Sequence, residues 1–142
     1  MGAFTLPTKM ALDVVTHNRH VVSEQVDEVV LPGEEGYLGA LPGHTPLLTS
    51  LKIGEIKYRI GNAWRYLCVS WGFVEILPDR VTVLADLAEA PEEIDVEQAK
   101  REAESARAKL KIPDADFVQQ QIALEQALVR LQVAAKAAPL PR

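Results

Sequence analysis

Short apolar runs with a period of two dominate residues 11–88. Residues 56–60 alternate apolar and basic side chains, Gly61-Asn62 interrupts them, and residues 64–69 resume the alternation. Two alternating arms around a turn of this kind are typical of a β-hairpin. Further runs of strand-forming residues occupy 12–15, 26–31, 73–77 and 81–84, and Pro78-Asp79 between the last two runs predicts a second hairpin. Several short strands at this spacing predict a β-sandwich or barrel.

The pattern changes to a helical period from residue 95 onwards. One stripe with steps of three and four contains Val96, Ala99, Ala103, Ala106 and Leu110. Such spacing places the stripe on one face of a helix. Asp95 is the predicted N-cap, with Gln98 three residues later as in a capping box. The segment 112–114 contains Pro113 and ends this helix, and Asp114 or Asp116 is expected to cap the next one.

Two neighbouring apolar stripes run along the second predicted helix. They consist of Phe117, Leu124, Leu128, Leu131 and Ala135, and of Val118, Ile122, Val129 and Val133. Together they form an apolar arc that is wider than a single contact requires. We therefore expect one stripe to pack on the first helix, and the other on the sheet domain or on another protein.

An acidic segment separates the two patterns. Residues 85–94 contain Pro91 and four carboxylates. Neither half carries the excess of one charge that marks a charged tail. The chain therefore divides into a sandwich domain over residues 1–88 and a helical hairpin over residues 89–142.

Composition excludes several classes of protein. The chain has 142 residues, 48% hydrophobic and 25% charged, which is a globular balance rather than a disordered one. Its net charge of -5 argues against a nucleic-acid binder. Cys68 is the single cysteine, so an internal disulfide and a cysteine zinc site are both excluded. No apolar run is long enough to span a bilayer, and the first ten residues lack the features of a signal peptide, so we expect a cytoplasmic protein.

A glycine-rich stretch lies at residues 32–54. Four glycines fall within eleven positions there, at 33, 36, 39 and 43. Their spacing matches neither a Walker loop nor a dinucleotide fingerprint, and no helix follows. We therefore expect these glycines to shape turns rather than to hold phosphate. The histidines lack matched acidic or cysteine ligands, so no metal site is predicted.

The same stretch carries a specific motif. Residues 41–49 read Leu-Pro-Gly-His-Thr-Pro-Leu-Leu-Thr and follow Glu-Gly-Tyr-Leu-Gly at 35–39. Together with Val-Ser-Trp-Gly-Phe-Val-Glu at 69–75 and Val-Thr-Val-Leu-Ala-Asp at 81–86, they resemble the epsilon subunit of bacterial F-type ATP synthase. The likeness covers roughly residues 11–136 and includes the alanine-rich helices.

This resemblance implies a flattened antiparallel β-sandwich, ten-stranded in the family, followed by an antiparallel pair of helices. It implies a non-catalytic rotor subunit without a cofactor, peripheral on the cytoplasmic face of the bacterial plasma membrane and attached only through the complex. The sandwich would bind the gamma subunit and rest on the c ring. The helices would fold against the sandwich or extend towards the catalytic alpha and beta subunits and inhibit ATP hydrolysis.

The resemblance also assigns contact residues. The expected contacts of the sandwich with its partners are Glu35, Tyr37, Leu41, Pro42, Gly43, His44 and Pro46. The expected contacts of the regulatory helix are Leu124, Leu128, Arg130, Leu131 and Lys136. For His44, a turn residue bonded to its own backbone is an alternative role. For the basic residues of the helices, intrahelical ion pairs on a solvated face are the alternative.

Three positions depart from the family pattern. Trp71 replaces a usual glycine, and Tyr37 stands where many relatives carry an acid facing the c ring. Some relatives bind ATP through an Ile/Leu-Asp-x-x-Arg-Ala motif, which reads Ile-Asp-Val-Glu-Gln-Ala at 94–99 here. Gln98 lacks the guanidinium that would pair with phosphate. Glu89 and Asp95 remain as candidate nucleotide contacts, and an ATP-sensing subunit remains an alternative within the family.

An alternative from another class is a small β-sandwich enzyme or ligand-binding domain that uses the 42–46 loop. The absence of clustered acids and histidines argues against it. Our main hypothesis is a hairpin with two positions, in which the apolar arc is covered either by the sandwich or by partner subunits. We expect Leu128 and Leu131 to lie on its docking face.

Overall fold

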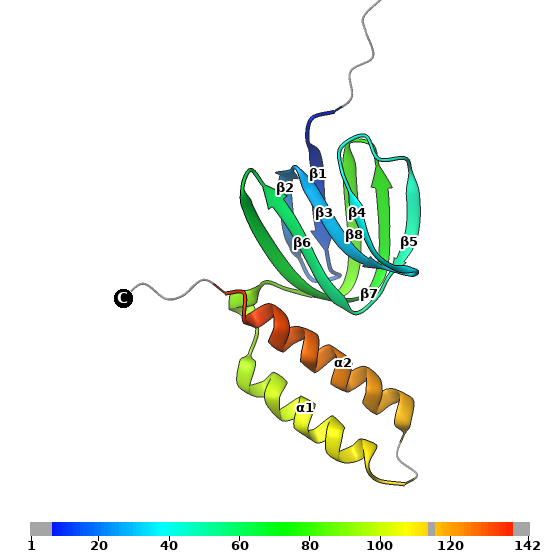
Figure 1. Cartoon of the computed structure of the whole chain (residues 1–142), viewed down its shortest axis with the longest axis vertical. Helices are drawn as coiled ribbons and strands as arrows, with labels where there is room; N and C mark the ends of the chain where they lie inside the picture. The colour runs from blue at the N-terminus through cyan, green and yellow to red at the C-terminus, as the bar shows by residue number, and fades with distance from the viewer. Residues whose placement is uncertain (1–6, 114–115, 138–142) are drawn as a thin grey trace, which may run out of the picture.

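Eight strands precede the helices in residues 7–113 and 116–137, which the computed structural model describes (Figure 1). The strands are β1 (Met10–Val15), β2 (His20–Val26), β3 (Glu28–Gly33), β4 (Gly36–Ala40), β5 (Leu47–Leu51), β6 (Gly54–Ile60), β7 (Ala63–Leu77) and β8 (Arg80–Glu89). The helices are the 3-10 turn η1 (Pro91–Glu93), α1 (Val96–Leu110) and α2 (Phe117–Ala134). The predicted hairpins around residues 61–62 and 78–79 are confirmed as β6–β7 and β7–β8.

The strands form one continuous sheet that folds over on itself. Its order is β2-β1-β8-β7-β5-β3-β4, and β6 pairs with β3 and β7. All pairs are antiparallel except β1 with β8. The predicted sandwich followed by a helical hairpin is confirmed, with eight strands in the described residues where the family resemblance implied ten.

β7 is a single strand with a bend in its middle, at Trp71-Gly72. Its first part pairs with β6 and its second part with β5. Both residues at the bend have positive φ, 51° for Trp71 and 143° for Gly72. A Cβ atom on Gly72 would lie 1.8 Å from the carbonyl oxygen of Leu84 on β8. The bend therefore requires glycine at position 72, for both backbone conformation and space.

Alternate residues of the strands fill the sandwich. In β1, for example, Met10, Leu12 and Val14 are fully buried, whereas the residues between them are half-exposed. All buried members of this cluster lie between Met10 and Ala88. The sandwich therefore holds a hydrophobic core to which the helices add no buried side chain.

The helices pack on each other along small residues. Asp95 caps α1, since its Oδ1 accepts a hydrogen bond from the backbone N–H of Gln98 at 3.0 Å. Asp116 caps α2 in the same way, while the other predicted cap, Asp114, lies outside the described residues. The side chains buried at the helix pair include Ala99, Ala103 and Ala106 of α1 and Ala127 of α2. Neither helix, as far as it is described, is long and apolar enough to cross a membrane.

Candidate functional site

An apolar patch is exposed on the outer face of β5, β7 and β8. We call Leu48, Phe73 and Leu84 the outer apolar patch; these side chains are 70%, 59% and 53% exposed. Phe73 lies directly opposite Leu84, and Leu48 lies opposite Glu75, two residues along β7, so all three side chains share one face. Neighbouring exposed apolar side chains of this size are typical of a protein interface.

The motif 41–46 forms a tight turn between β4 and β5. The backbone N–H of His44 donates to the carbonyl of Leu41 at 3.1 Å, and Gly43 supplies the positive φ of 89° that the turn needs. The N–H of Gly43 donates to the carbonyl of Pro78 at 2.7 Å, which ties the turn to the β7–β8 connection. The ring of His44 lies against the carbonyl of Thr45 and is half-buried, whereas Leu41 is 55% exposed. The prediction that the glycines shape turns is therefore confirmed for Gly43 and for Gly36, whose φ is 117°, whereas Gly33 and Gly39 lie within β3 and β4 without a positive φ.

The other predicted contacts lie at the opposite end of β4. Glu35 is exposed in the β3–β4 turn, and Tyr37 is 61% exposed. The Tyr37 hydroxyl accepts a hydrogen bond from the backbone N–H of Glu55 at 3.0 Å, which lays the side chain across Gly54. Tyr37 and Leu48 line one groove of about 430 Å³. The structure thus brings Glu35 and Tyr37 beside the outer apolar patch and separates them from the 41–46 turn by the length of β4.

The hairpin is attached to the sandwich by a small apolar cluster. Val133 of α2 is fully buried against Cys68 of β7 and Ile94 of the linker. Tyr66, Val129 and Ala134 surround these three residues and are only half-buried. The hairpin therefore occupies the docked position in this structure.

Arg130 connects three elements beside this cluster. Its Nε donates to Glu89 Oε1 at 2.9 Å, and its Nη2 reaches Glu89 Oε2 at 3.4 Å. Its Nη1 reaches Glu102 Oε2 of α1 at 3.4 Å. Burial by itself would lower the pKa of Arg130, but the hydrogen bond and charge of Glu89 outweigh burial and raise it. The guanidinium thus stays charged while its side chain is 11% exposed.

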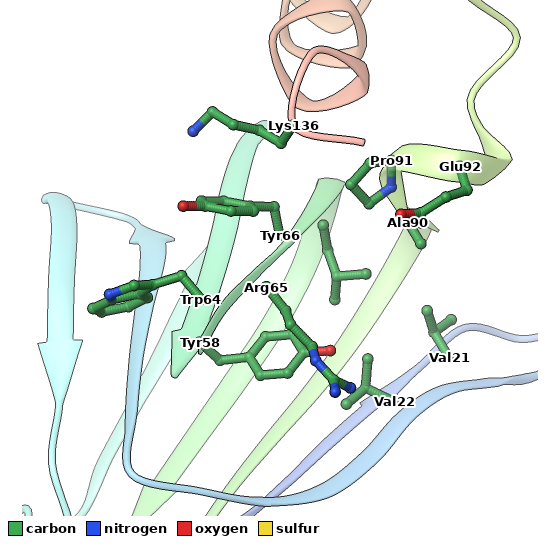
Figure 2. A pocket seen from close by; sticks show the side chains of 11 residues that line it. Val21, Val22, Tyr58, Trp64, Arg65, Tyr66, Ala90, Pro91, Glu92 and Lys136 are labelled. Atoms are coloured by element: carbon green, nitrogen blue, oxygen red, sulfur yellow. The ribbon is translucent and has the colours of Figure 1, made fainter. Parts of the chain in front are cut away.

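A second cation closes the end of α2. The Lys136 ammonium lies 3.5 Å from Glu55 Oε1 and 4.1 Å from the centre of the Tyr66 ring. Figure 2 shows Lys136 above Tyr66 at the rim of a cavity of about 420 Å³. Beneath α2, burial and then the charge of Glu89 raise the pKa of the Cys68 thiol to about 12. Among the described residues no cluster of side chains could hold a metal ion.

The remaining predicted residues have different surroundings. Leu128 is 40% exposed and, with Leu124, lines a groove of about 480 Å³ along the helices. The buried contact with the sandwich is made by Val133 rather than by Leu128, because Val133 lies on the neighbouring stripe of the helix. The candidate nucleotide contacts are both engaged within the chain, Glu89 with Arg130 and Asp95 as a helix cap.

Sequence reasoning missed the acidic partners of Arg130 and Lys136. Glu55 and Glu102 carry no motif, and each is far along the chain from the cation that it meets. No sequence pattern pairs opposite charges that lie on different elements of the fold. Only the fold brings them together.

Comparison with known proteins gives a consistent result. A family model described as "ATP synthase, Delta/Epsilon chain, beta-sandwich domain" matches residues 9–91. The ATP synthase epsilon chain 2 of Syntrophotalea carbinolica is 46% identical over 131 residues, covering 90% of this chain and 95% of that one. The ATP synthase epsilon chain of Dehalococcoides mccartyi is 48% identical over 131 residues, covering 90% and 94%.

Solved structures show the same fold. A chain of the Euglena gracilis mitochondrial ATP synthase, from a structure titled OSCP/F1/c-ring in rotational state 1, aligns with a TM-score of 0.81 and 28% identity. The alignment covers 94% of this chain and 86% of that chain. A chain from the central stalk and c ring of the Tetrahymena thermophila mitochondrial ATP synthase aligns with a TM-score of 0.58 and 16% identity, covering 93% and 98%. This second alignment supports the fold alone.

Proposed function

This chain belongs to the family of ATP synthase epsilon chains, and from that premise we propose that its sandwich joins the gamma subunit to the c ring while its hairpin restrains ATP hydrolysis. As an epsilon chain it is a non-catalytic subunit of the central stalk. The enzyme alternative is therefore set aside. We place the chain at the cytoplasmic face of the bacterial plasma membrane, peripheral and held there by its partners.

The sandwich offers two separate surfaces for the two proposed partners. We assign the gamma subunit to the outer apolar patch, because exposed Leu48 and Phe73 would bury well against a partner. We assign the c ring to the 41–46 turn, where Leu41 projects from a backbone fixed by the hydrogen bond from Gly43 to Pro78. This assignment departs from the family resemblance at Tyr37, which lies beside the outer apolar patch and so on the side given to gamma. Figure 1 shows the β4–β5 connection at the end of the sandwich away from the helices.

The hairpin suits a regulatory element because its attachment is small. Its contact with the sandwich is centred on one fully buried residue, Val133, while Phe117, Val118 and Leu128 remain exposed on α2. Exposed apolar residues on a weakly attached helix can be covered by another protein. We propose that the catalytic alpha and beta subunits cover them. The extended hairpin would then block the conformational changes of these subunits that accompany rotation of the stalk.

The proposed division into residues 1–88 and 89–142 fits these surfaces. The core of the sandwich uses no buried residue after Ala88. β8 itself ends at Glu89, one residue beyond the proposed boundary, and η1 follows at Pro91. The observation that carries the functional proposal is this combination of a sandwich with a complete core and a hairpin held by a small apolar cluster and two ion pairs.

Reconstitution with the gamma subunit and the catalytic hexamer tests the proposal. The full chain should lower the rate of ATP hydrolysis, and a variant lacking residues 95–142 should still bind but leave the rate high. Phe73→Asp should weaken binding of the full chain to gamma, with exposed Lys100→Gln on α1 as a control. Equal hydrolysis rates with the full and shortened chains would contradict a regulatory hairpin.

A further inference from the structure

We propose that Arg130 is the latch of the docked hairpin, and that its ion pairs, more than the apolar contact, set how often the hairpin opens. The inference rests on the two-position hairpin of the proposed function and names the contact that governs its balance. It concerns the isolated chain, so it can be tested without any partner subunit.

The apolar contact alone is a weak attachment. Two hairpin-side residues, Val133 and Ile94, are buried against the sandwich, and Ile94 belongs to the linker rather than to a helix. The three side chains around them, those of Tyr66, Val129 and Ala134, are only half-buried. Hydrophobic stabilisation scales with the apolar area removed from water, so a contact of this size leaves the docked and open positions close in free energy.

Arg130 makes one contact with β8 that exists only when the hairpin is docked, and a second contact with α1 that lies within the hairpin. The planar guanidinium meets both oxygens of Glu89 at the end of β8 and one oxygen of Glu102 on α1. Fork-shaped pairing of this kind is stronger and more directional than a lysine contact. The side chains of Arg130 and Glu89 are 11% and 17% exposed, so solvent and salt screen the pair only weakly.

Loss of Arg130 acts selectively on the docked position. There Glu89 would remain mostly buried without its cation, and a buried carboxylate without a partner is costly. In the open position Glu89 is hydrated, so the loss of Arg130 does not raise its free energy. The remaining Lys136–Glu55 contact is longer, at 3.5 Å, and its lysine is 38% exposed, so it is a poorer substitute.

Cys68 supplies a native reporter of opening. It is the single cysteine of the chain, it is 2% exposed, and α2 covers it through Val133. A disulfide reagent such as 5,5′-dithiobis(2-nitrobenzoate) therefore reacts with it at a rate set by hairpin opening. Each rate is divided by the rate of the same variant unfolded in urea, which removes differences in intrinsic reactivity.

We expect Arg130→Gln to raise the normalised rate at least tenfold, and Glu89→Gln to raise it by a smaller factor, because the amide oxygen of the new side chain can still accept a hydrogen bond from Arg130. The direction of the rate change distinguishes opening of the hairpin from a change in the reactivity of the thiol. The Arg130 charge favours the Cys68 thiolate, so its removal would by itself slow the reaction of a docked chain. A faster reaction can come only from opening. Lys100→Gln, which removes an exposed ion pair within α1, is the matched control and should change the rate less than twofold.

Val133→Asp serves as the reference for an open hairpin and should expose Cys68 fully. If Arg130→Gln matches wild type while Val133→Asp reacts fast, apolar contact alone holds the hairpin and the latch is refuted. If Val133→Asp leaves Cys68 protected, α2 does not cover the thiol and the inference also fails. Neither result alters the reconstitution test of inhibition, and an absence of inhibition would leave this result unchanged.

Discussion

Trp71 takes a left-handed backbone at the bend of β7, with a φ of 51°. This conformation costs a residue with a side chain about 1–2 kcal/mol compared with glycine, the residue that the family resemblance leads us to expect there. The indole ring is half-buried, and the Lys52 ammonium lies 5.8 Å from its centre. The departure from the family pattern is thus accommodated by an outward-facing ring, while Gly72 alone meets the steric demand of β8.

Gly72→Ala should destabilise the sandwich by about 3 kcal/mol or more, since its Cβ would overlap the carbonyl of Leu84 and its φ of 143° disfavours a side chain. Gly39→Ala on β4 is the control, because nothing lies within 4 Å of its added Cβ, and it should stay within about 0.5 kcal/mol of wild type. Urea unfolding followed by Trp fluorescence measures both. Equal stability of the two variants would show that β8 moves away at no cost.

Strands with a buried alternating face could be predicted from sequence, and exposed strands could not. β6 and the arms of β7 and β8 carry clear alternation. β4 and β5 escaped prediction because glycines and exposed leucines hide their period. The predicted run 26–31 corresponds to β3 preceded by Val26, the last residue of β2, and most of β2 also escaped prediction. Asp27 separates the two strands and accepts a hydrogen bond from the N–H of Gly61 at 2.7 Å.

The candidate site could likewise be predicted only in part. The motif identified the 41–46 turn, and helix periodicity identified the stripe that contains Val133. The choice of docking stripe was wrong for Leu128, because two adjacent apolar stripes on one helix are equivalent until a partner surface is known. The pairing of Arg130 with Glu89 spans 41 residues and depends on where the fold places both.

At the scale of elements, the close approach of α1 and α2 depends on alanine. Ala103 is 2% exposed between the helices, whereas Ala108 on the same helix is exposed. Ala103→Leu should therefore overpack the pair and destabilise it by about 1–3 kcal/mol, whereas Ala108→Leu should be nearly neutral. Amide exchange across residues 96–134 should rise in the first variant alone. A rise in both would point to helix propensity or solubility rather than packing.

At the scale of the whole molecule, the surfaces are arranged along one axis. Figure 1 shows the β4–β5 turn at one end of the sandwich and the helical hairpin at the other. The outer apolar patch lies on the flank between them, on β5, β7 and β8. Under the proposed function, three partners would be engaged at once, since no surface overlaps another. The hairpin would then leave the sandwich without disturbing the other two surfaces.

The core of the sandwich contains no buried residue after Ala88, so we expect the sandwich to fold without the helices. A variant of residues 1–94 keeps η1, whose Glu93 pairs with Arg19 at 2.8 Å and whose Pro91 is buried. It should unfold cooperatively and lose only about 1–3 kcal/mol, the contribution of one small apolar contact and of the ion pairs that Arg130 and Lys136 make with the sandwich. A variant of residues 1–79 is the matched control and should not fold, because it lacks β8, which joins β1 to β7. Urea unfolding, followed by circular dichroism, distinguishes the two. A non-cooperative transition in the longer variant would mean that the hairpin and the sandwich share one folding unit, and a hairpin that cannot leave the sandwich could not act as a switch.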